Sequence, residues 1–285
     1  MISSLNRQTQ TPIWQWQQWD GLPYLTCTLL QAWKHGFLTQ QFSPRLPENL
    51  TEVLHPNATT YRVKQVHGCR VLTATEVKKQ ITTETPEDIF PSADGLITDD
   101  KNQAIWVASA DCTPVLVGDI KTHRVAAIHA GWRGTAQRIV PEAIAYFQHF
   151  GSTLDNLRIA MGPAISGEVY QVSEQVAAEV GSSLFKTEEK SSPQEILEAL
   201  RTMFDSPILP DPKPGRVRLD VRRVNELQLY ELGIKTNQIA IAPHCTYQEP
   251  DDFFSYRRTK QKKVQWSGIV CGDYLKQSNC EDLLL

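Results

Sequence analysis

Three apolar runs in the middle of the chain, residues 103–110, 113–119 and 124–130, predict buried strands. Their apolar positions are almost continuous, which suits strands covered on both faces, although buried helices show such runs too. Stretches 24–30 and 60–66 mix apolar, polar and β-branched residues and predict two shorter strands. The chain is therefore expected to have a β-rich centre.

Helical spacing replaces this pattern after Gly134. Apolar residues recur at 136, 139, 140, 143, 144 and 147 and predict a helix, for which Thr135 is a suitable N-cap. Pro141 lies inside this stretch and lacks a backbone donor. It is expected either to kink the helix or to occupy the first turn of a second one.

Three further helices follow from local signals. One begins at Ser173, one at the capping box formed by 192–195, and one covers 220–233 with a glycine at its end. The proline-rich stretch 205–216 predicts a surface connection between the last two. Strands and helices alternate without a clear boundary, so the fold class is mixed α and β.

The length of 285 residues allows one large domain with a substantial core. We expect an irregular or edge segment over 1–20, one catalytic domain over 21–275 and a tail over 276–285. No leader pattern opens the chain and no run is long and apolar enough to span a membrane, so no membrane association is expected. The six cysteines are scattered, which is typical of reduced thiols in a cytoplasm.

Charge excludes one large class of partners. Lysine and arginine number 29 against 32 acidic residues, a net charge of -3, and no basic stripe with interleaved aromatics is present. No nucleic-acid binding is therefore expected.

Three metal-binding side chains, His67, Cys112 and His129, each come where a strand is expected to end. Strand ends are places where polar side chains converge at a pocket rim. One thiolate and two imidazoles would leave a fourth position open on Zn²⁺, as in catalytic sites, although copper also accepts these ligands. Each residue also has a simpler interpretation, as a hydrogen-bonded histidine or a buried inert thiol.

The turn that follows His129 contains Gly131, Arg133 and Gly134. A glycine turn that enters a helix presents backbone N–H groups to an anion, and an arginine can bind phosphate or carboxylate through two hydrogen bonds. Alternatively, Arg133 pairs with Asp94 or Asp111. Either acid could instead orient a metal-bound histidine or act as a general acid or base.

Several stretches together resemble the YfiH/laccase-domain family. They are "KQVHG", "ADGLIT", "ADCTPVLVGD", "AAIHAGWRGTAQRIV", "MGPAIS" and "FFSYRR", in family order over about residues 35–270. The resemblance implies a single α/β domain of mixed sheets with helices on both sides, layered α-β-β-α and similar to cysteine-dependent toxins. It also implies a zinc site at His67, Cys112 and His129.

The implied activity is phosphorolysis of adenosine, inosine and S-methyl-5′-thioadenosine, together with deamination of adenosine, in the cytoplasm. The partners would be a nucleoside and phosphate, and the chain a monomer or homodimer. Within this interpretation, the catalytic residues are Cys112, His129, Arg133 and Asp111. The substrate-binding residues are Arg133, Gly134, Asp94 and, in the "MGPAIS" turn, Gly162.

The chain departs from the family pattern at two positions, where Ala164 replaces a common cysteine and Gln40 a common arginine. Three other functions remain open. Copper-dependent oxidation of phenols is one, although the seven histidines contain no His-X-His pair for a multicopper cluster. The second is hydrolysis of cell-wall precursor peptides by Cys112 with His129 as base, and the third is metal binding without catalysis.

Overall fold

The structure is a computed structural model and describes residues 13–81, 90–185 and 192–272. Two sheets of six strands form its main body. The first sheet has the order β1 (Trp14–Trp19), β2 (Leu22–Cys27), β3 (His35–Leu38), β15 (Gln265–Cys271), β7 (Gln103–Ser109) and β4 (Thr59–Tyr61). The second has the order β14 (Ile239–Ile241), β10 (Leu157–Met161), β8 (Thr113–Asp119), β9 (Val125–Ala130), β6 (Gly95–Ile97) and β5 (Val71–Thr73). Both sheets contain parallel and antiparallel pairs.

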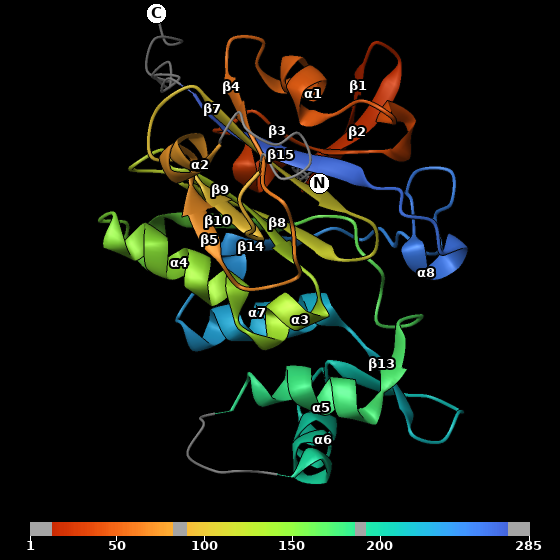
Figure 1. Cartoon of the computed structure of the whole chain (residues 1–285). Coiled ribbons are helices and arrows are strands. Elements are labelled where there is room, and N and C mark those ends of the chain that lie inside the picture. The colour runs from red at the N-terminus through yellow and green to blue at the C-terminus, as the bar shows by residue number, and fades with distance from the viewer. Residues whose placement is uncertain (1–12, 82–89, 186–191, 273–285) are drawn as a thin grey trace, which may run out of the picture.

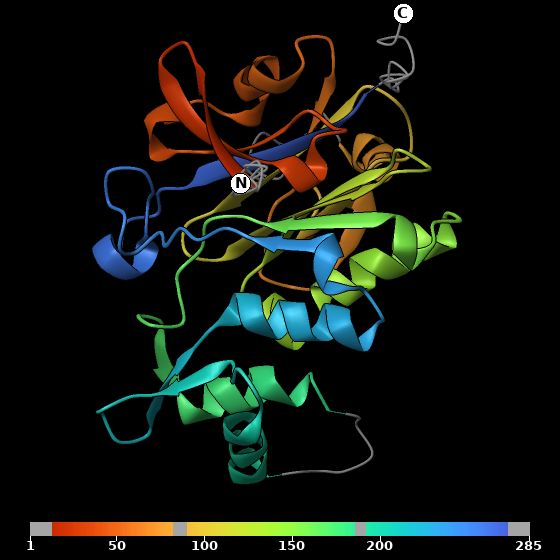
Figure 2. The ribbon, with the colours of Figure 1, turned by 180° about the vertical axis from the view of Figure 1, so that it is seen from behind.

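The two sheets pack face to face, and helices lie on their outer faces (Figures 1 and 2). The helices are α1 (Pro47–Leu54), α2 (Ala74–Gln80), α3 (Trp132–Ala136), α4 (Ile139–His149), α5 (Glu174–Ser182), α6 (Pro193–Thr202), α7 (Val221–Glu231) and α8 (Tyr256–Thr259). Strand β7 shows why its apolar run is continuous: Ile105 faces the core between the sheets, and Trp106 faces the cluster that includes α1. The second sheet buries its outer face against α4 and α7. The predicted α-β-β-α layering is confirmed.

A small lobe, residues 171–219, lies beside the main body (Figure 1). It contains α5, α6 and a sheet of order β11 (Gln171–Ser173), β13 (Arg216–Leu219) and β12 (Ile208–Pro210). The expected surface position of 205–216 is confirmed, since most of these residues are exposed, but the stretch contributes a hairpin that the sequence did not predict. The prolines are compatible with a hairpin because β12 is an edge strand and Pro212 and Pro214 lie between the two strands.

The glycine turn leads into two helices rather than one. Gly131 is the N-cap of α3, and α4 begins at Ile139 after Arg138, which has a left-handed φ of 62°. Pro141 is in the first turn of α4, as one of the two alternatives predicted. The expected cap at Thr135 was wrong, because its hydroxyl accepts a hydrogen bond from Asn225 instead.

The first described residues form a strand that pairs with β2. Trp14–Trp19 is an edge strand, β1, rather than an irregular segment, because Trp14 packs edge-on against Phe37 at 5.6 Å between ring centroids. The expected tail, 276–285, lies outside the described residues. Among the helices that the structure describes, none has the length and apolar character needed to cross a membrane.

Candidate active site

The three predicted metal ligands converge at one end of the second sheet. Cys112 lies in the turn between β7 and β8, and His129 is the penultimate residue of β9, opposite Pro114 of β8. His67 lies in the loop before β5 with a left-handed φ of 61°. The ligand atoms of the three side chains all lie within 4.8 Å of one another. The structure thus brings together residues that are far apart in the sequence.

Asp94 organises two of these three side chains. It is fully buried, and its carboxylate accepts the backbone N–H groups of Val66, His67 and Gly68 at 2.8–3.1 Å. The same carboxylate lies 2.9 Å from Nδ1 of His129. These bonds hold the unusual backbone of His67 and direct the Nε2 atom of His129 toward the ligand group. The contacts favour an orienting role over direct binding of substrate, since Asp94 has no exposed surface.

The protonation of the site suits a metal. Burial raises the pKa of Cys112, but the charge and hydrogen bond of His129 outweigh it, so the pKa falls below its usual range. Burial lowers the pKa of His129, but the negative charges of Cys112 and Asp94 outweigh it and raise the value. Both directions favour a thiolate beside an imidazolium, whose proton a metal cation would displace. With a thiolate and two imidazoles as donors, the site fits zinc.

Two glycines allow the chain to pass close to the ligand group. A Cβ atom on Gly131 would lie 2.8 Å from the Cys112 sulfur, and one on Gly134 would lie 2.9 Å from the carbonyl oxygen of Gly68. The turn therefore packs directly against the loop of His67. Gly134 has a steric role here, whereas the resemblance implied contact with substrate.

Arg133 is exposed and stacks on the ring of Trp132, with 4.3 Å between its Cζ atom and the ring centroid. Neither Asp94 nor Asp111 forms an ion pair with it among the described residues. Because α3 has only five residues, its dipole adds little to anion binding. Any anion held at this turn would depend on the guanidinium.

Asp111 has a left-handed φ of 92° and is nearly buried. Its two carboxylate oxygens accept the hydroxyl of Thr246 at 2.8 Å and the backbone N–H of Arg257 at 2.7 Å. Both oxygens are thus engaged, so these contacts favour a positioning role over general acid or base chemistry. Gly162 lies against Phe37, whose ring would overlap any Cβ added there. Packing therefore explains this glycine without a substrate.

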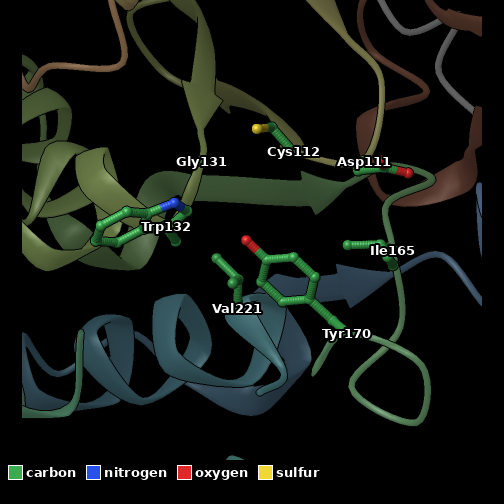
Figure 3. Close-up of a pocket in the computed structure, with 7 residues that line it drawn as sticks. All are labelled: Asp111, Cys112, Gly131, Trp132, Ile165, Tyr170 and Val221. Atoms are coloured by element: carbon green, nitrogen blue, oxygen red, sulfur yellow. The ribbon is translucent and has the colours of Figure 1, made fainter. Parts of the chain in front are cut away.

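A pocket with an empty volume of about 230 Å³ opens beside Cys112 (Figure 3). Its wall includes Ile165, which belongs to the "MGPAIS" stretch, and two residues that the sequence did not indicate, Tyr170 and Val221. The Tyr170 hydroxyl points into the pocket toward Cys112. Burial raises the pKa of Tyr170 to about 12, so it stays a neutral hydrogen-bond donor. No local motif marks Tyr170 and Val221, which the loop before β11 and the first residue of α7 bring to the site.

The two departures from the family pattern lie in well-packed surroundings. The Gln40 amide donates to the carbonyl oxygens of Pro250 and Asp251 at 2.6 and 2.9 Å. Ala164 is buried and forms an isolated bridge with Cys245. Neither position lines the pocket beside Cys112.

Comparisons with known proteins identify the family to which the chain belongs. A purine nucleoside phosphorylase from Synechocystis sp. is 55% identical over 258 residues, which are 90% of this chain and 97% of the relative. An adenosine deaminase from an unknown prokaryotic organism is 28% identical over 195 residues, 68% of each chain. YlmD from Geobacillus stearothermophilus shares the fold, with a TM-score of 0.73 at 23% identity over 90% of this chain and 98% of that one. The family described as multi-copper polyphenol oxidoreductase laccase matches residues 46–271. The chain therefore belongs to this laccase-domain family, as its sequence motifs indicated.

Proposed function

We propose that this chain is a zinc-dependent purine nucleoside phosphorylase that also deaminates adenosine. The observation that carries the proposal is the group of His67, Cys112 and His129, which meets beside a pocket. The relative named purine nucleoside phosphorylase covers nearly the whole chain at 55% identity, which supports this reaction over others. Adenosine, inosine and S-methyl-5′-thioadenosine are the expected nucleosides, with phosphate as co-substrate.

His67, Cys112 and His129 would hold the ion. When bound, Zn²⁺ would supply Lewis acidity at the reacting end of the substrate. Asp94 accepts from Nδ1 of His129, which keeps the other ring nitrogen available as a ligand. Cys112 serves as a thiolate, for which its lowered pKa is suited.

Arg133 would bind phosphate, because its guanidinium is exposed and has no carboxylate partner among the described residues. In phosphorolysis a phosphate oxygen forms a bond to C1′ of the ribose while the bond from C1′ to the purine nitrogen breaks. The electron pair leaves with the base, which then takes up a proton. In deamination, water replaces the amino group of adenosine and ammonia is released.

Product analysis of the zinc-loaded protein tests the proposal. In phosphate buffer, adenosine, inosine and S-methyl-5′-thioadenosine should each give the free base and a pentose 1-phosphate. Adenosine should give inosine both with phosphate and in a buffer that contains none. Cys112→Ala should abolish both activities, whereas Cys271→Ala, a change in a buried cysteine of β15, should keep them. Absence of both free base and inosine with the wild type would overturn the proposal.

The phosphate site has its own control. Arg133→Ala should raise the KM for phosphate about 10-fold or more, since a charge-assisted hydrogen bond contributes about 1.5–3 kcal/mol. Arg201→Ala removes another exposed arginine, from α6, and should leave this KM unchanged. An unchanged KM in Arg133→Ala would remove Arg133 from the mechanism.

Peptide hydrolysis by Cys112 is a second candidate, favoured by the pairing of this thiol with His129. A zinc-bound cysteine is a poor nucleophile, so metal occupancy separates the two functions. Alkylation of Cys112 that stops activity and is not prevented by zinc would support hydrolysis. Metal analysis and a phenol-oxidation assay in the same preparations test the copper-dependent reaction.

A further inference from the structure

Part of the wall of the pocket beside Cys112 is formed by apolar side chains. Trp132 contributes an indole, and Ile165 and Val221 contribute aliphatic side chains. Ile165 and Val221 are 4% and 6% exposed, so they form a firm surface. A ribose carries hydroxyl groups that need hydrogen-bond partners on several sides, which this wall does not offer. A flat heteroaromatic ring, whose faces are apolar and whose polar atoms lie on its edge, fits it better.

Besides Cys112, two polar side chains line the pocket, Asp111 and Tyr170, and both carboxylate oxygens of Asp111 already accept hydrogen bonds within the protein. The Tyr170 hydroxyl faces the pocket and has no hydrogen-bond partner among the described residues (Figure 3). A hydroxyl that lacks a partner within the protein gains most when a ligand supplies one. The edge of a purine ring carries nitrogen acceptors that a phenol can reach.

Arg257 holds the tyrosine ring in place. Its guanidinium lies over the ring at 4.7 Å from Cζ to the centroid, and its Nη1 donates to the carbonyl oxygen of Gln171 at 2.7 Å. The backbone N–H of Arg257 is bound in turn by Asp111. Stacking and hydrogen bonds thus tie Tyr170 to the residue that precedes Cys112. The hydroxyl is set in position before any ligand arrives.

The groups around the pocket differ in exposure. Ile165 and Val221 on its wall are buried. Arg133 is exposed next to Trp132, so the sugar and phosphate have room on the solvent side.

We propose that Trp132, Ile165, Tyr170 and Val221 form the subsite for the purine base, and that the Tyr170 hydroxyl hydrogen-bonds the base edge. This inference rests on the proposed function and deepens it, because it states which part of the nucleoside enters the pocket. Tyr170 is then a specificity-determining residue that contacts substrate. The ribose lies between the ligand group and Arg133.

Binding of the two product fragments tests the subsite separately from turnover. Calorimetry on the zinc-loaded protein gives Kd values for adenine and for ribose 1-phosphate. In Tyr170→Phe, which keeps the ring and its stacking on Arg257, adenine should bind about 2- to 10-fold more weakly. The Kd of ribose 1-phosphate should stay within about twofold of the wild type. Val221→Phe, which places a larger side chain in the pocket, should abolish adenine binding.

Tyr61→Phe is the matched control, because it removes a tyrosine hydroxyl outside the pocket. Tyr61 belongs to β4 of the first sheet and does not line the pocket. It should leave both Kd values unchanged. Zinc content and melting temperature, measured for every variant, exclude a structural cause. Steady-state assays should show the Tyr170→Phe loss in kcat/KM for each purine nucleoside.

The outcomes separate the two proposals. If the wild type converts no nucleoside, the proposed function itself fails. If it is active, but adenine binding does not change in Tyr170→Phe and Val221→Phe, the subsite assignment is wrong and the function stands. A loss confined to ribose 1-phosphate would likewise overturn the assignment, because it would place the sugar in the pocket.

Discussion

His35 should make the stability of the fold depend on pH. It is the first residue of β3 and only 6% exposed. Its Nδ1 lies 2.9 Å from the carbonyl oxygen of Trp33, and its Nε2 accepts the backbone N–H of Cys27 at 2.8 Å. A neutral ring with its proton on Nδ1 satisfies both contacts. Protonation of Nε2 would turn an acceptor into a donor that faces another donor.

The magnitude follows from the pKa. Burial lowers the pKa of His35 from 6.5 to about 4, despite the opposing bond to the carbonyl oxygen of Trp33. Between pH 4 and 6.5, His35 therefore binds a proton in the unfolded chain but not in the folded chain. Stability is complete above pH 6.5, falls as the pH drops toward 4, and then levels off. The whole loss is about 3 kcal/mol, of which about 2 kcal/mol occurs between pH 7.5 and 5.

Urea unfolding of the wild type and of His35→Gln between pH 7.5 and 5 measures this effect. Glutamine can both donate and accept but does not titrate, and all other titrating groups are shared by the two proteins. The difference between their free energies of unfolding should therefore shift by about 2 kcal/mol in favour of the variant as the pH falls. A difference that stays constant to within about 0.5 kcal/mol would refute the argument that His35 is held neutral.

Three substitutions test other parts of the structure. Asp94→Asn should weaken zinc binding about 10- to 100-fold in a chelator competition, because an amide has one acceptor oxygen for several donors; unchanged affinity would deny its orienting role. Gly131→Ala should lower the zinc content, since its Cβ would lie 2.8 Å from the Cys112 sulfur; full occupancy would show that the turn moves aside. Gly162→Ala should destabilise the fold by about 1–3 kcal/mol in urea unfolding, because its Cβ would overlap the ring of Phe37. Its adenine affinity should not change, and weaker binding at full stability would instead support contact with substrate.

Local signals in the sequence predicted several elements well. Ser173 and Ser192 cap α5 and α6 through their side chains, and Gly233 follows the end of α7 with a φ of 94°. Such signals succeed because a cap is a hydrogen bond between residues two or three positions apart. The hairpin in the proline-rich stretch 205–216 was missed, because whether such a segment pairs as a hairpin depends on the strand beside it.

The candidate site also combines features that the sequence indicates with features that depend on the fold. The sequence by itself indicated the three candidate ligand residues, since motifs carry this information in a few adjacent residues. It placed His67 at the end of a strand, which was wrong, because β4 already ends at Tyr61 and His67 lies in the following loop. Only the tertiary structure decided that Asp94 orients His129 and that Tyr170 from the edge of the small lobe faces Cys112. These contacts join residues 35 and 58 positions apart, and their formation depends on how sheets and lobe pack. Hydrogen bonding and burial act through space, so only the packed fold assigns these side chains their partners.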